Sequence, residues 1–117
     1  MTHPNALLVE RFYAAFAKLD AEGMASCYQP DIIFSDPVFG ELRGARAANM
    51  WRMLAGRAKD LKVEVSGIEA DDRQGKARWI ATYTFGKTGR PVRNVIDARF
   101  QFRDGKIARH DDSFPLW

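Results

Sequence analysis

The sequence has little that would bind a cofactor or stabilise a secreted protein. Its single cysteine, Cys27, cannot form an internal disulfide, which predicts a reducing compartment, the cytoplasm. There is no CxxC or HExxH pattern, no Walker loop and no GxGxxG motif, so we expect no metal, nucleotide or other cofactor. No apolar run approaches the roughly 20 residues of a membrane helix, and no basic segment leads into an apolar core at the N-terminus. We therefore expect no membrane association and no signal peptide.

Blocks of like charge are also missing. The net charge of +3 comes from 18 Lys and Arg against 15 Asp and Glu, and the two signs are interleaved, as in Arg103-Asp104-Gly105-Lys106. This mixture favours an ordinary surface over nucleic-acid binding. With 46% hydrophobic and 28% charged residues, the 117-residue chain has the composition of one globular domain, residues 1–117, that can bury its own core.

Apolar side chains at helical spacing predict three helices. The first covers residues 5–18, and the third covers residues 45–57. Between them, Asp20 is a suitable N-cap for a short helix that extends through Tyr28 and is ended by Pro30.

Alternation of apolar and polar residues predicts the strands. One strand precedes the third helix and four follow it, joined by turns such as Asp104-Gly105; the predicted strands are residues 31–36, 61–69, 77–85, 92–103 and 106–114. Residues 38–44 form a loop or a short hairpin. This order predicts an α+β fold in which helices pack on one face of a strongly twisted antiparallel sheet.

The same alternation predicts which polar side chains face the helices. In residues 92–103 the mostly apolar set contains Phe100 and Phe102, which brings Asn94 inward and turns Asp97 outward. In the last strand, Phe114 favours an inward set that also contains His110 and Asp112, whereas Ile107 favours the opposite set. In the first strand, an inward Phe34 brings Asp36 inward.

These assignments yield one candidate polar cluster: Asp36, Asn94, His110 and Asp112. A few polar groups in a mostly aromatic cavity are typical of a ligand site. Apolar surroundings disfavour the charged form of a carboxylate, which lets such a group act as a base near neutral pH. Three of these residues also have a structural interpretation: Asp36 before Pro37 as a turn residue, His110 as a buried structural histidine, and Asn94 as a partner of buried backbone groups.

Two segments carry a resemblance to a known family. "FSDPVFGELRG" at residues 34–44 and "RDGKIARHDDSF" at residues 103–114 resemble the SnoaL-like group of the nuclear transport factor 2 (NTF2)-like superfamily. The resemblance implies a cone-shaped α+β barrel, with a curved sheet wrapped around the N-terminal helices and a small apolar molecule in the pocket between them. It also implies a homodimer that pairs through the sheet.

The resemblance also implies candidate roles. Asp36 matches the general base of ketosteroid isomerase, whose helix tyrosine is replaced here by Phe12, next to Tyr13. Asp112 matches the acid of SnoaL-type polyketide cyclases. Arg78 and Asp112 match two members of the limonene epoxide hydrolase set, but Ile80 replaces the third.

Together these observations predict an acid–base enzyme, of the isomerase, cyclase or hydrolase type, or a binding or dimerisation module of the same fold. The predicted catalytic residues are Asp36, His110 and Asp112. The predicted substrate-binding residues are Asn94, Phe12, Phe16, Tyr28, Trp51, Trp79, Phe100 and Phe114.

Overall fold

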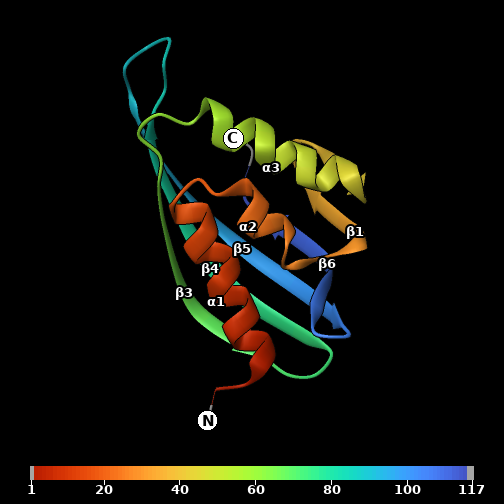
Figure 1. The fold of residues 1–117 in the computed structure, drawn as a ribbon. Helices are drawn as coiled ribbons and strands as arrows, with labels where there is room; N and C mark the ends of the chain where they lie inside the picture. The colour runs from red at the N-terminus through yellow and green to blue at the C-terminus, as the bar shows by residue number, and fades with distance from the viewer. Residues whose placement is uncertain (1, 116–117) are drawn as a thin grey trace.

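The computed structural model describes residues 2–115 and shows three helices on one face of a curved sheet (Figure 1). The long helix α1 (Pro4–Ala17) lies against the sheet, the short α2 (Ala21–Ala25) follows it, and α3 (Ala45–Arg57) packs beyond α2. Asp20 caps α2 as predicted, because its carboxylate accepts the amide hydrogen of Gly23. None of the described helices is long and apolar enough to cross a membrane.

The second helix is shorter than its sequence predicts. It ends at Ala25, and the strand β1 (Tyr28–Asp36) begins before Pro30 rather than after it. The prediction that Tyr28 lies on a helix was therefore wrong. Pro30 fits within β1 because the register with the neighbouring strand β6 is interrupted between Tyr28 and Ile33, which leaves room for a residue that has no amide hydrogen.

The sheet has six strands in the order β2-β1-β6-β5-β4-β3. The remaining strands are β2 (Gly40–Arg43), β3 (Lys62–Ala70), β4 (Gln74–Thr84), β5 (Pro91–Arg103) and β6 (Lys106–Ser113). Every neighbouring pair is antiparallel, as predicted, except β1 and β6, which run parallel. The sheet is therefore mixed, and its parallel pair places the first and last strands side by side in the middle of the sheet.

A β-bulge resolves the two competing faces of the last strand. Ile107 pairs with Phe102 and Arg109 pairs with Gln101, so one extra residue of β6 lies between these pairs. The shift allows Ile107 to be buried at the start of β6 while His110 and Asp112 are buried further along. Both patterns in the sequence are therefore correct, each for one half of the strand.

Strand β5 follows the predicted alternation. Ile96, Ala98, Phe100 and Phe102 are buried against the helices, and Asp97 is exposed on the outer face, where it pairs with Arg78 at 2.9 Å. The inner face of the sheet and the buried sides of α1 and α3 form one aromatic core, which includes Phe12, Phe16, Phe34, Trp51 and Trp79.

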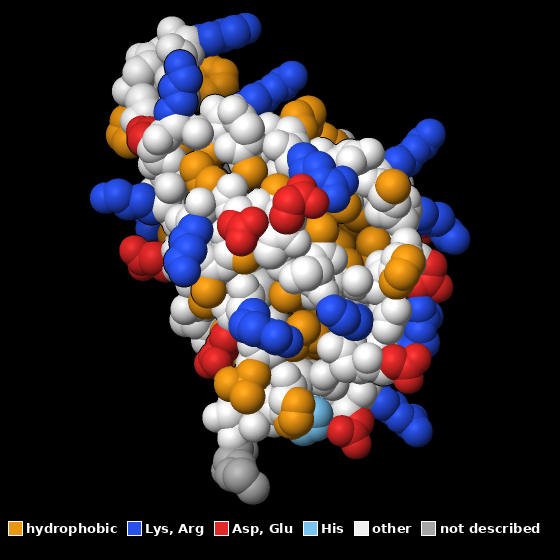
Figure 2. Space-filling view, viewed as in Figure 1, with side chains coloured by type: hydrophobic (Ala, Val, Ile, Leu, Met, Phe, Trp, Pro, Cys, Tyr) orange, Lys and Arg blue, Asp and Glu red, His pale blue; other side chains and the backbone are white. Residues whose placement is uncertain are grey.

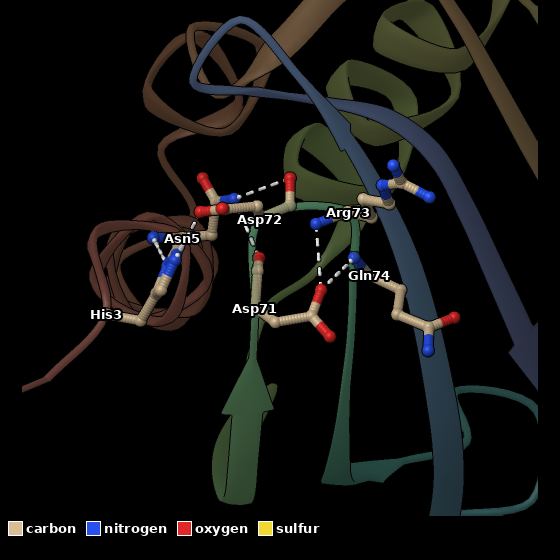
Figure 3. Close-up of polar contacts among 6 residues, drawn as sticks. All are labelled: His3, Asn5, Asp71, Asp72, Arg73 and Gln74. Carbon is tan, nitrogen blue, oxygen red and sulfur yellow. Dashed lines mark hydrogen bonds and ion pairs between the residues drawn. The ribbon is translucent and has the colours of Figure 1, made fainter.

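The start of α1 is tied to the turn between β3 and β4 (Figure 3). The Asn5 side chain, which is buried, donates to the backbone oxygen of Asp71 at 3.0 Å. His3 Nδ1 caps the helix by accepting from the Asn5 amide, and its Nε2 lies 2.8 Å from Asp72 Oδ1. Asp71 in turn accepts from the amides of Arg73 and Gln74, which lowers the pKa of its carboxyl group. These contacts fix the position of α1 along the sheet.

We expect Asn5→Ala to lower the free energy of unfolding by about 1 kcal/mol, because it removes a hydrogen bond to the β3–β4 turn and leaves a carbonyl without that donor. Urea denaturation would measure the change. The control is Asn49→Ala, which removes an exposed amide that accepts from Arg52 and should change stability by less than about 0.5 kcal/mol. Equal effects of the two substitutions would contradict the role given to Asn5.

Candidate functional site

A pocket of about 560 Å³ opens between α3 and the inner face of the sheet. Its walls are mostly apolar and come from α1, α3, β4 and β5, with the β1–β2 turn at one side. Three members of the predicted polar cluster line it: Asp36, Asn94 and Asp112. Four of the predicted aromatic residues line it as well: Phe16, Trp51, Trp79 and Phe114. These seven predicted residues therefore lie on the wall of one pocket, and their contact with a ligand stays a prediction.

Asp112 is the buried carboxylate of the pocket. Its side chain is only 2% exposed, although it lies on the pocket wall. Its Oδ1 is 2.8 Å from His110 Nε2 and accepts a longer contact of 3.4 Å from Trp79 Nε1. No hydrogen bond to Oδ2 is found in the described part of the chain, so this oxygen keeps its capacity to accept one.

Behind Asp112, a chain of hydrogen bonds runs through the core. Trp51 Nε1 donates to the Tyr28 hydroxyl at 2.9 Å, and this hydroxyl is 2.8 Å from His110 Nδ1. The His110 side chain is fully buried and packs against the rings of Phe100, Phe34 and Phe12. Burial raises the pKa of the Tyr28 phenol well above its usual value, so the hydroxyl keeps its proton.

This chain fixes the tautomer of His110. Trp51 Nε1 can only donate, so the Tyr28 oxygen accepts its hydrogen bond. The Tyr28 hydroxyl then donates its own hydrogen to His110 Nδ1, which acts as the acceptor. His110 then carries its ring proton on Nε2 and donates it to Asp112 Oδ1. The histidine does not line the pocket; it holds the carboxylate in place from behind.

Asp36 lies beside Asp112 on the neighbouring strand. The parallel register pairs Phe34 with His110 and Ser35 with Asp111, so the next step brings Asp36 level with Asp112. Neighbouring strands are about 4.8 Å apart. The two carboxylates therefore share one region of the pocket wall.

Asp36 also performs the turn role that its sequence context indicates. Its Oδ1 accepts the amide hydrogens of Val38 and Phe39, at 2.9 and 2.5 Å, and so closes the turn into β2. Its other oxygen makes no hydrogen bond within residues 2–115. The structural and the functional interpretation of Asp36 are thus compatible, since different oxygens serve them.

The other predicted binding residues lie in the core around the pocket. Phe12, Tyr28 and Phe100 are buried and contact His110 rather than lining the pocket. Their predicted contact with a ligand stays a prediction. Within the described residues, no group of three His, Cys, Asp or Glu side chains could hold a metal ion.

Tyr13 is a residue whose position the sequence analysis missed. Its side chain is 2% exposed, and its hydroxyl has no hydrogen-bond partner among residues 2–115. Burial, with the nearby charge of Asp112, raises the pKa of this phenol well above its usual value. Helical spacing could have found it, because Tyr13 follows Val9 by four residues and precedes Phe16 by three on the buried side of α1.

Comparison with known proteins identifies the family. The model of the SnoaL-like domain matches residues 9–110. The chain belongs to the SnoaL-like domain family. This confirms the resemblance seen in the sequence and agrees with the NTF2-like architecture of the structure. No curated protein sequence matches the chain.

Solved structures share the fold of this SnoaL-like protein at low sequence identity. An LEH-like epoxide hydrolase from M. tuberculosis is 23% identical, with a TM-score of 0.81 over 97% of this chain and 84% of that one. TerC, co-crystallised with polyporic acid, is 20% identical, with a TM-score of 0.81 over 97% and 92%. A Catenulispora acidiphila protein with a ketosteroid isomerase-like fold, in complex with trimethylamine, is 12% identical, with a TM-score of 0.81 over 93% and 85%.

The two buried tyrosines should respond oppositely to removal of the hydroxyl. An unsatisfied buried polar group costs about 1–3 kcal/mol, so Tyr13→Phe should raise the free energy of unfolding by about 1 kcal/mol. Tyr28→Phe should lower it by about 1–3 kcal/mol, because it leaves Trp51 and His110 without their shared partner. Urea denaturation of both variants tests this. A loss of stability in Tyr13→Phe would mean that its hydroxyl has a partner.

Proposed function

We propose that this protein is an acid–base enzyme for a small, mostly apolar compound, with Asp112 as the group that takes a proton from the substrate or from a water molecule. The observation that carries this proposal is the buried Asp112 on the pocket wall, with one oxygen held by His110 and the other available. A carboxylate fixed in this way can act as a base without reorganising when a substrate binds.

The neighbouring residues have complementary roles in the proposal. His110 and Tyr28 position the carboxylate and stabilise its charge through the Nε2–H hydrogen bond. Asp36 is the second carboxylate, suited to exchange a proton with the same substrate. Ala98 is the residue of β5 that pairs with Asp112, and Asn94 lies four residues before it, about 13 Å away along the strand. In the proposal Asn94 therefore contacts a different part of the ligand from Asp112.

The reaction class in this proposal is proton abstraction next to a carbonyl, or the related cyclisation, isomerisation, hydration or epoxide opening. The apolar walls support a mostly apolar substrate, and the two carboxylates can exchange protons with it. Proteins of the same fold include an epoxide hydrolase and a protein crystallised with polyporic acid, which agrees with this range of compounds.

A second candidate is a protein that binds an apolar compound without converting it, or a dimerisation module. The bonds from two backbone amides to Asp36 favour it, because they give this carboxylate a complete structural role. In that case the pocket retains its ligand, and Asp112 only orients it.

Asp112→Asn should lower turnover by about 10²–10⁴-fold, the usual contribution of a general base. The assay is product formation from a panel of epoxides, cyclic ketones and polyketide-like esters. Asp104→Asn is the matched control, because it removes an exposed carboxylate in the β5–β6 turn, outside the pocket. Full turnover by a double Asp36→Asn, Asp112→Asn variant would contradict the proposal. Ligands that stabilise the fold without yielding product would support the second candidate.

We also propose that two copies pair through the outer face of the sheet. On this face the half-buried side chains of Val95 and Ile80 lie opposite each other on β5 and β4. Ion pairs such as Arg78–Asp97 and Arg109–Asp111 lie around them. Light scattering should give twice the chain mass of 13.3 kDa. Val95→Glu should shift the protein toward monomer, since it places a charge at the centre of the contact. A monomeric native protein would contradict this proposal.

A further inference from the structure

The net charge of the chain is concentrated at one end of the pocket. Two loops, each counted with the last residue of the element before it, lie at this end of the pocket: residues 57–61, from the end of α3 to β3, and residues 84–90, from the end of β4 to β5. They carry four cations, Arg57, Lys59, Lys87 and Arg90, and one carboxylate, that of Asp60. Their net charge of +3 equals that of the whole chain, so the remaining residues sum to zero.

The four cations are not neutralised by ion pairs with residues 2–115. Cations elsewhere in the fold do form such pairs, for example Arg52 with Glu22 and Arg78 with Asp97. The one acid of these loops, Asp60, is tied to the opposite loop, because its carboxylate accepts the amide hydrogen of Thr84 at 3.1–3.2 Å. That bond lowers the pKa of the Asp60 carboxyl group and holds the two loops together.

The loops lie directly at the pocket. Arg57, Lys59 and Asp60 from one loop, and Thr84 and Gly86 from the other, are part of its wall. In Figure 1 the β4–β5 hairpin projects beyond the sheet beside the end of α3, and Figure 2 shows Lys and Arg side chains gathered at this end of the molecule, with few acidic ones. Any compound that enters the pocket from this end passes close to these charges.

The mouth also has an apolar part. Val38 and Phe39, in the β1–β2 turn, line the pocket and are 65% and 38% exposed. Phe85, in the β4–β5 loop, is 47% exposed. Exposed apolar side chains that are grouped around a pocket are typical of a ligand-binding surface. The mouth therefore combines apolar contact area with the excess positive charge of the two loops, while Asp36 adds one carboxylate beside Val38 and Phe39.

We propose that the ligand of this pocket is an apolar organic anion, whose apolar body lies between α3 and the sheet and whose carboxylate, sulfonate or phosphate group lies between the two basic loops. The inference rests on the proposed function only in using the same pocket, and it names the class of compound that the pocket takes. In this proposal the charged group stays at the mouth, where it is solvated and faces Arg57 and Lys59.

Positive charge at a pocket mouth should act on both affinity and rate. Exposed ion pairs each contribute little, and salt screens them. Several cations around one opening add up, and they also attract an anion from a distance and speed its association. Binding of an anion should therefore weaken as the salt concentration rises, whereas binding of a neutral compound of the same shape should not.

Two fluorescent probes that differ by one charged group test the proposal. They are 8-anilinonaphthalene-1-sulfonate, an anion, and N-phenyl-1-naphthylamine, its neutral counterpart. We expect the native full-length protein to bind both, with mutual displacement, and only the anion to bind more weakly at high salt. A variant with Arg57→Gln, Lys59→Gln, Lys87→Gln and Arg90→Gln should lose about fivefold or more in affinity for the anion and less than about twofold for the neutral probe.

The matched control removes four cations away from the mouth, by Arg11→Gln, Lys18→Gln, Arg46→Gln and Arg73→Gln. It changes the net charge by the same amount and should leave both affinities within about twofold of the native values. Equal loss of anion affinity in the two variants would show an effect of net charge alone and would overturn the proposal. The proposal would also be overturned if the four mouth substitutions left the affinity for the anion unchanged, or if the two probes did not compete with each other.

The same titrations separate this inference from the proposed catalysis. Asp112→Asn should keep the preference for the anion, because the charged group is held by the loops and not by Asp112. If the preference is present but no tested compound is converted, the ligand class stands and the catalytic proposal fails. If turnover depends on Asp112 but the anionic probe does not bind more tightly than the neutral probe, the catalytic proposal stands and this inference fails.

Discussion

The hydrogen bond from His110 Nε2 to Asp112 Oδ1 joins the interior of the protein to its pocket. On one side of this bond lies a fully buried imidazole, fixed by Tyr28 and Trp51 and enclosed by aromatic rings. On the other side lies a carboxylate on the pocket wall. Each polar group in this chain has a partner, which matters because an unpaired buried donor or acceptor costs about 1–3 kcal/mol. The network therefore contributes to the fold and at the same time orients the one carboxylate suited to chemistry.

The sheet topology places these groups together. The parallel pairing of β1 with β6 brings Tyr28 and Asp36, at the two ends of β1, beside the strand that carries His110 and Asp112. The bulge in β6 lets Ile107 be buried without turning His110 and Asp112 outward. A one-residue slip would place the whole inner set on the outer face, so the bulge and the aromatic core together specify the register.

Much of this arrangement could be predicted from the sequence, because one buried face imposes a simple period on each strand. The inward Asn94 and outward Asp97 follow from the apolar residues around them, and Asp36 follows from Phe34. The short α2 was predicted too long because propensity does not show that Tyr28 pairs with Ile107, a residue 79 positions away in the chain. The parallel pairing of β1 and β6 and the contact between Tyr28 and His110 depend on such distant contacts, and no local pattern encodes them.

The tautomer of His110 depends on the complete chain of donors and acceptors from Trp51 to Asp112. Nitrogen-15 NMR of the imidazole of the native protein at neutral pH distinguishes a protonated from an unprotonated ring nitrogen. The account predicts a protonated Nε2 and an unprotonated Nδ1 for His110. A proton on Nδ1, alone or together with one on Nε2, would contradict it, because the Tyr28 hydroxyl could then not donate to the ring. With the proton on Nδ1 alone, Nε2 could not donate to Asp112 either.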